Sequence, residues 1–223
     1  MKKLSLSLIF VLLFILTKAQ SVFVRFVTNK GNITVMLYDE TPAHKEMFLK
    51  AIKTGAYKNA EFNRVIKSFV SQGGELDDTI LNREKRFSQL GVKRFPAEIK
   101  SALFHKKGAL GAGRDDNPDK ASYFTQIYFV AGKKQTDAQL DAIEQKKNRK
   151  IPEAQRTVYK TIGGTPHLDQ NYTVFGEIVE GMEIADAINN VVTDKNDVPL
   201  TPVVFNLVVL SKKEASKLRR KLK

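Results

Sequence analysis

The sequence predicts a mainly β protein in which a closed antiparallel barrel carries helices at its ends. Many short segments are rich in β-branched and aromatic residues and are bounded by turn signals, and two other segments carry apolar residues at helical spacing. The chain has 223 residues, of which 42% are hydrophobic, enough for one domain with a sizeable core. A barrel with end helices would bury both kinds of apolar surface.

The first two predicted strands form a hairpin. Residues 22–28 and 32–38 are strand-like, and Gly31 supplies the positive φ that the turn between them favours. Alternate residues from Ile33 to Leu37 are large and apolar, so we expect this face of the second strand to point into the core.

A helix is predicted shortly after the hairpin. Thr41 suits the N-cap position, Pro42 the first helical position and Gly55 the position beyond the C-terminus. The apolar stripe of this helix, which we expect to be buried, consists of Met47, Phe48, Ala51 and Ile52.

The remaining elements are predicted by the same criteria. Residues 75–119 are loop-rich with one strand-like segment inside, and a capping box formed by Thr136 and Gln139 opens a surface helix. Strands are expected over residues 60–74, 108–112, 124–130, 172–179 and 202–210, and helices over residues 136–147 and 182–191.

The N-terminus is typical of a signal peptide spanning residues 1–19. Lys2 and Lys3 precede an apolar run at residues 4–16, and small residues end at Ala19. The alternative is an uncleaved membrane anchor, but the run is shorter than the roughly 20 residues that span a bilayer. Because the chain also lacks cysteine, we expect an exported protein of the periplasm of a Gram-negative bacterium, with secretion as the alternative. After cleavage we expect no stable membrane insertion.

The formal net charge of +13 is unevenly distributed. Residues 212–223 hold seven basic residues and one acid, and the signal segment removes three more lysines, so the rest of the chain is only mildly basic. We therefore divide the mature chain into a domain at 20–211 and a basic C-terminal tail at 212–223, and expect no nucleic-acid-binding face. The tail is interpreted as a solvated end, with a weak contact to an anionic surface as the alternative.

The usual catalytic residue sets are missing from the sequence. The three histidines are far apart and lack metal-ligand spacing, there is no cysteine nucleophile, and no G-x-S-x-G motif marks a serine hydrolase. We therefore expect no metal and no cofactor. Composition and spacing alone lead no further than an exported β-rich domain.

Four sequence blocks indicate a family. Residues 62–74 read FNRVIKSFVSQGG, residues 108–114 GALGAGR and residues 125–130 TQIYFV. HLD at 167–169 is followed by YTVFG at 172–176. In this order the blocks resemble the signatures of the cyclophilins, and the resemblance covers about residues 22–210.

The resemblance implies an eight-stranded antiparallel barrel capped by two helices, with an extra surface helical insertion at about residues 133–164. It also implies a peptidyl-prolyl cis–trans isomerase that assists the folding of exported polypeptides. Its partners would be proline-containing polypeptides, and the protein would be a monomer.

The resemblance further implies a peptide groove on the outer face of the barrel. Arg64 would be the catalytic residue, with Gln72 beside it on the substrate backbone. Four residues would form the apolar proline pocket, namely Phe69, Val70, Tyr128 and Leu168. Gly113 and Arg114 would line the neighbouring subsite, and Gln126 would support the side of the groove that carries Arg64. His167 and Tyr172 would lie at the rim of the groove.

An arginine suits this chemistry because rotation of an X–Pro bond breaks no covalent bond and needs neither nucleophile nor metal. A non-catalytic proline-peptide binding or chaperone module is the alternative. It is favoured by the small residues at 111–113, which depart from the family pattern and are expected to loosen that strand and widen the adjoining subsite.

Overall fold

The computed structural model describes residues 21–222, so the predicted signal peptide lies outside the described residues. The described strands are β1 (Val22–Thr28), β2 (Gly31–Leu37), β3 (Ala60–Ile66), β4 (Val70–Gly74), β5 (Ala109–Ala112), β6 (Gln126–Val130), β7 (Val174–Glu180) and β8 (Val204–Val209). The described helices are α1 (Pro42–Lys53), α2 (Asp77–Arg86), α3 (Asp137–Lys147), α4 (Glu153–Thr161), α5 (Met182–Asn189) and α6 (Lys212–Lys221), with short 3-10 helices η1 (Ser88–Leu90) and η2 (Pro166–Leu168).

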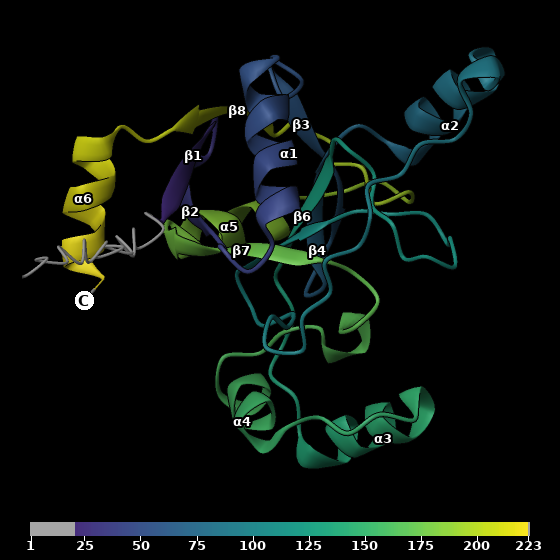
Figure 1. The fold of residues 1–223 in the computed structure, drawn as a ribbon. Coiled ribbons are helices and arrows are strands. Elements are labelled where there is room, and N and C mark those ends of the chain that lie inside the picture. Colours follow the sequence, from purple (N-terminus) through teal and green to yellow (C-terminus); the bar gives the residue numbers. More distant parts are fainter. Residues whose placement is uncertain (1–20, 223) are drawn as a thin grey trace, which may run out of the picture.

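The eight strands form a closed antiparallel barrel, which confirms the predicted fold class (Figure 1). Their order around the barrel is β1-β2-β7-β5-β6-β4-β3-β8, and β8 pairs with β1 to close it. Closure leaves no free sheet edge. Strands β3, β4, β6 and β5 are consecutive neighbours in this order, so the four strands between residues 60 and 130 form one continuous wall of the barrel.

The barrel interior is filled by large apolar side chains. Phe26 packs against Phe129 with ring centroids 4.9 Å apart and against Phe205 at 5.4 Å. Helix α1 adds Phe48 to this core and α5 adds Ile188, and both side chains are fully buried. These are the two helices that carry the predicted apolar stripes.

One part of the predicted α1 stripe is wrong. Phe48 and Ala51 are buried, but Met47 is only half-buried, and His44 is buried in the same helix instead. The His44 ring lies 2.7 Å from a Glu98 carboxylate oxygen and 3.2 Å from the Ser122 hydroxyl. A polar ring with both nitrogens paired can be buried, which apolar periodicity does not reveal.

The segment at 60–74 is a hairpin of two strands rather than one continuous strand. Ser68 in the turn between β3 and β4 has φ of 60°, and its backbone N–H donates to the Asn189 side chain. In addition, helix α2 lies within the stretch expected to be loops. Because it buries only Ile80, it carries no apolar stripe that could have predicted it.

The insertion at about 133–164 forms two helices that lie together below the barrel in Figure 1. The predicted capping box at Thr136 and Gln139 is present at the start of α3. Helix α4 is not predicted from the sequence. Most of α3 is exposed, as predicted, and its Leu140 forms a small apolar cluster with Ile151 of the loop before α4 and Tyr159 of α4.

The C-terminal segment is a helix docked on the barrel. Ala215 and Leu218 of α6 are buried against Phe23 and Leu210, and Ser211 caps the helix. The interpretation of this segment as a solvated end is therefore wrong for its inner face, while Lys212, Lys213, Lys217 and Arg220 are exposed on the outer face. Among residues 21–222, no helix has the length and apolar character needed to cross a bilayer.

Candidate active site

A row of directly opposed residues crosses four neighbouring strands of the barrel wall. Arg64 of β3 faces Gln72 of β4, Gln72 faces Tyr128 of β6, and Tyr128 faces Gly111 of β5. Directly opposed residues in a sheet share one face. Side chains inside the barrel come from the adjacent, alternate positions, such as Val65 next to Arg64 and Phe129 next to Tyr128, so the row lies on the outer face.

A cavity of about 380 Å³ lies over this row. It collects all of the sequence-predicted site residues except one. Its wall consists of Arg64, Phe69, Val70, Gln72, Asp77, Gly113, Arg114, Gln126, Tyr128, Leu168 and Tyr172. The exception, His167, is not part of the wall, but its ring stacks on Phe69 with centroids 5.3 Å apart, so it lies beside the cavity.

The apolar side of the cavity belongs to a cluster separate from the barrel core. Val70 and Tyr128 are buried in this cluster, with Phe69, Leu168 and Tyr172 packed against them. A five-membered hydrophobic ring is a suitable occupant for such a pocket, because it buries apolar area without needing hydrogen bonds.

Tyr128 has its hydroxyl group paired beneath the cavity. The side chain is only 4% exposed, and its hydroxyl lies 2.8 Å from His105 Nε2. Burial raises the pKa of Tyr128 well above its ordinary value. The Tyr128 hydroxyl is thus paired with His105 and does not project into the cavity as a free polar group.

The small residues at 111 and 113 do not widen a subsite, contrary to our expectation. A Cβ added to Gly111 would lie 2.2 Å from Tyr128 Cζ, and one added to Gly113 would lie 2.0 Å from Gln126 Oε1. Larger neighbouring side chains therefore occupy the space that the glycines leave.

Arg64 is the charged group at the polar end of the cavity. Its side chain is 42% exposed, and its guanidinium lies 3.9 Å from Asp197. An exposed ion pair at this distance is weak, so the guanidinium can turn to a bound peptide.

The side chain of Gln126 does not support Arg64, as the family resemblance implied, but is hydrogen-bonded at the start of α2. Its side-chain amide donates to the Glu75 carbonyl oxygen, 3.0 Å away, and to the Asp77 carboxylate. Among the described residues its hydrogen bonds lead to the start of α2 and not to Arg64. The sequence does not predict Asp77 as a site residue, because α2, which begins at Asp77, carries no apolar stripe.

Arg114 lies over the Tyr172 ring, 4.8 Å from its centroid. The same guanidinium donates to three backbone carbonyl oxygens, those of Asn171 at 2.7 Å, Asp115 at 2.6 Å and Asn117 at 3.3 Å. Arg114 thereby fixes the loop that carries Tyr172, and its side chain forms part of the wall and not a free charge.

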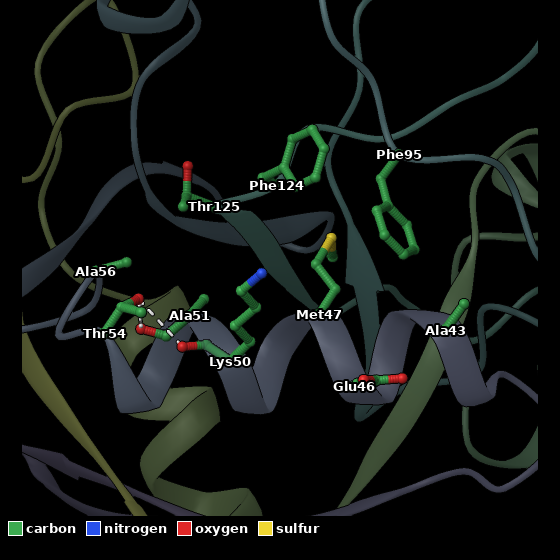
Figure 2. Close-up of a pocket in the computed structure, with 10 residues that line it drawn as sticks. All are labelled: Ala43, Glu46, Met47, Lys50, Ala51, Thr54, Ala56, Phe95, Phe124 and Thr125. Carbon is green, nitrogen blue, oxygen red and sulfur yellow. Dashed lines mark hydrogen bonds between the residues drawn. The ribbon is translucent and has the colours of Figure 1, made fainter.

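A second cavity, of about 410 Å³, contains none of the predicted site residues. Figure 2 shows Met47 of α1 directed toward Phe95 and Phe124, with Lys50 and Glu46 along the same helix. Its lining is mostly apolar. The half-buried Met47 belongs to this cavity and not to the barrel core.

Within residues 21–222, no group of three or more acidic or histidine side chains is arranged to hold a metal ion. The wall of the candidate site carries the guanidinium groups of Arg64 and Arg114, the amides of Gln72 and Gln126, the Asp77 carboxylate and an apolar pocket. Such a set can bind and polarise a peptide bond next to a small ring without covalent chemistry.

Comparisons with known proteins agree with this geometry. The sequence model of a family described as cyclophilin type peptidyl-prolyl cis-trans isomerase/CLD matches residues 23–208. A putative peptidyl-prolyl cis-trans isomerase of Staphylococcus saprophyticus is 30% identical over 182 residues, covering 81% of this chain and 87% of the relative. A protein of the same description from Staphylococcus haemolyticus is 31% identical over the same shares.

Solved structures show the same fold. A cyclophilin type peptidyl-prolyl cis-trans isomerase of Cryptosporidium parvum superposes with a TM-score of 0.61 at 20% identity, covering 86% of this chain and 99% of that one. The same Cryptosporidium protein in the presence of the dipeptide Ala-Pro gives a TM-score of 0.60 at 21% identity, covering 85% and 99%. The match of the family model over most of the chain is decisive: this protein belongs to the cyclophilin-type peptidyl-prolyl cis–trans isomerase family.

Proposed function

We propose that this isomerase binds a proline-containing peptide in the cavity over β4 and β6 and uses Arg64 to stabilise the twisted prolyl bond. The observation that carries the proposal is the row in which Arg64, Gln72 and Tyr128 are direct neighbours. It sets a guanidinium and an amide donor at one end of an apolar pocket.

The chemistry follows from the amide bond. Rotation about an X–Pro bond meets a barrier of about 18–20 kcal/mol because twisting destroys amide resonance. In the twisted state the proline nitrogen regains a lone pair. A guanidinium donor aimed at this nitrogen stabilises the twisted state more than either planar isomer, which is the condition for rate enhancement. Arginine suits the task because it stays charged.

The other wall residues would divide the substrate between them. Phe69, Val70, Leu168 and Tyr128 hold the proline ring while the acyl side rotates, and the Gln72 amide meets the neighbouring backbone. Gly113 and Arg114 line the subsite beyond the ring, while Tyr172 and His167 stand at its rim.

The test is cis–trans exchange in an Ala-Pro peptide followed by NMR. We expect Arg64→Ala to reduce the catalysed exchange rate by about 100-fold or more, the loss typical for one transition-state donor. Peptide affinity should change little. The matched control is Arg25→Ala, which removes a half-buried arginine of β1 that pairs with Glu214 at 3.5 Å. Undiminished exchange in Arg64→Ala would refute the role of Arg64.

The alternative of a non-catalytic proline-peptide binding module loses its main support. It was favoured by the small residues at 111–113, but Tyr128 and Gln126 fill the space beside those glycines. Peptide binding by the wild-type protein without faster exchange would revive it.

The exported role belongs to this proposal as well. It rests on the signal-type composition of residues 1–19 and on the absence of cysteine, which suit folding assistance outside the cytoplasm of a Gram-negative cell. Uncatalysed prolyl isomerisation takes tens to hundreds of seconds and can limit folding there. Mass spectrometry of the periplasmic fraction should find a mature chain beginning at Gln20; a chain beginning at Met1 in the cytoplasm would contradict export.

We further propose that the protein acts as a monomer and that the outer face of α6 makes weak contact with anionic surfaces. Lys212, Lys213, Lys217 and Arg220 are exposed along this helix. Such a contact is electrostatic and weakens with salt. Sedimentation with phosphatidylglycerol vesicles at low and high salt, with and without residues 212–223, tests it.

A further inference from the structure

A continuous chain of buried hydrogen bonds links the insertion to the candidate proline pocket. The Tyr159 hydroxyl of α4 donates to Asp169 Oδ2 over 2.7 Å. The other oxygen of Asp169 lies 2.8 Å from His105 Nδ1 and also accepts the His105 backbone N–H at 2.8 Å. His105 Nε2 in turn lies 2.8 Å from the Tyr128 hydroxyl.

The chemistry of these groups gives the chain a direction. A carboxylate only accepts hydrogen bonds, so Nδ1 of His105 carries a proton toward Asp169. In the neutral ring, Nε2 is then an acceptor and the Tyr128 hydroxyl is its donor. Each group in the chain therefore fixes the proton position and orientation of the next.

Burial makes this arrangement difficult to leave. His105 and Tyr159 are fully buried, and Asp169 is 5% exposed. A polar group that loses its partner at this depth cannot readily hydrogen-bond to solvent instead. The free energy lost by leaving it unpaired exceeds the net contribution of the hydrogen bond to stability. The chain of contacts, here called the His105 relay, consists of Tyr159, Asp169, His105 and Tyr128.

A second link from the insertion reaches the rim of the same pocket. Arg149 lies 3.7 Å from Asp169 Oδ2 and donates to the Pro166 carbonyl oxygen at 2.9 Å. Pro166 opens η2, the short helix that carries His167 and Leu168. The insertion is thus connected to the pocket in two ways. Arg149 binds the segment that carries His167 and Leu168, and the His105 relay binds Tyr128.

We propose that His105 and Asp169 are positioning residues through which the insertion at 133–164 sets the place of Tyr128 in the proline pocket. This inference rests on the proposed function of the pocket. Tyr128 lies opposite Gln72 in the sheet, but among the described residues no side-chain hydrogen bond joins the relay to Arg64 or Gln72. We therefore expect the relay to control how well the ring is held and not how the twisted bond is stabilised. Loss of the relay weakens the binding of substrate and transition state alike, which raises KM and leaves kcat unchanged.

The primary variant is Tyr159→Phe, which removes a single hydroxyl of α4 and retains the ring. We expect KM for an Ala-Pro peptide to rise about fivefold, as for the loss of one buried hydrogen bond. The matched control is Tyr57→Phe. Tyr57 is also buried, and its hydroxyl has no hydrogen-bond partner among the described residues. Its loss should leave both kcat and KM unchanged.

A double variant separates positioning from general destabilisation. In a Tyr128→Phe background the relay has lost its connection to the pocket, so adding Tyr159→Phe should not raise KM further. A similar rise of KM with and without the Tyr128 hydroxyl would overturn the inference. So would a fall of kcat at constant KM in the single variant.

A readout independent of catalysis distinguishes this inference from the proposed function. The ring resonances of labelled Tyr128 should shift in Tyr159→Phe and stay in place in Tyr57→Phe. If Arg64→Ala retains full activity while these shifts occur, the proposed role of Arg64 fails and the relay stands. Unshifted Tyr128 resonances refute the relay. Should Tyr159→Phe fail to fold, Arg149→Gln tests the same connection from a less buried position, with the same expected rise of KM.

Discussion

Tyr128 and Gly111 are opposite each other on β6 and β5, and the tyrosine ring covers the glycine. A Cβ added to Gly111 would lie 2.2 Å from Tyr128 Cζ and 2.4 Å from the hydroxyl oxygen. The glycine is therefore a complement to the tyrosine. Two contacts determine where the Tyr128 ring lies in the candidate pocket. His105 pairs with its hydroxyl group, and Gly111 leaves room for the ring itself.

The first prediction follows from this contact. Gly111→Ala should lower the free energy of unfolding by about 2 kcal/mol, as overpacking does, and should raise KM because the ring is displaced. Urea unfolding and the NMR exchange assay measure the two effects. The double variant with Tyr128→Leu should recover stability but not KM. An alanine tolerated without loss of stability would show that the ring is free to move away.

The second prediction concerns the weak ion pair of Arg64. Its guanidinium lies 3.9 Å from Asp197, and both side chains are about two-fifths exposed. Asp197→Asn should therefore change the free energy of unfolding by less than about 0.5 kcal/mol and the exchange rate by less than about twofold. A tenfold loss of activity would instead mean that Asp197 orients Arg64 for catalysis.

Much of the fold was predictable from local patterns. The hairpin at residues 22–38 and the capping box at Thr136 follow rules that act within a few residues, and both are present. Elements without an apolar stripe were not predictable. Helix α2 buries only Ile80, and the docking of α6 depends on Phe23 at the opposite end of the chain.

The membership of the candidate site was predictable because a sequence resemblance fixed the positions of its residues. Its internal contacts were not. The pairing of Tyr128 with His105 joins residues 23 positions apart, and that of His105 with Asp169 joins residues 64 apart. Such side-chain contacts depend on tertiary packing, which neither periodicity nor spacing encodes. For the same reason the sequence predicts a loosened strand at Gly111, whereas in the structure the Tyr128 ring packs over this glycine.

The third prediction concerns pH and His44. Burial lowers the pKa of His44 below its ordinary value of 6.5, although Glu98 acts in the opposite direction. The unfolded chain then binds a proton at a higher pH than the folded chain does, so stability falls as the pH drops below about 6.5. The pKa of His167 is also lowered by burial, which adds to the same slope.

Urea unfolding between pH 7.5 and 5 measures this slope. His44→Gln retains groups that can pair with Glu98 or Ser122 but cannot titrate, so the dependence should become shallower. A slope that is identical in the variant would assign the acid sensitivity to other groups, with Glu98 contributing only at lower pH because its pKa is itself lowered.

The last prediction tests whether α6 is part of the folded domain. Leu218 is 6% exposed and packs with Ala215 against Phe23 and Leu210. Leu218→Ala should therefore lower the free energy of unfolding by about 2 kcal/mol, the lower end for a buried leucine. Lys217→Ala, one position away on the exposed side, should change it by less than about 0.5 kcal/mol. Equal and small effects of both variants in urea unfolding would mean that α6 undocks at little cost and that the basic segment behaves as a solvated tail.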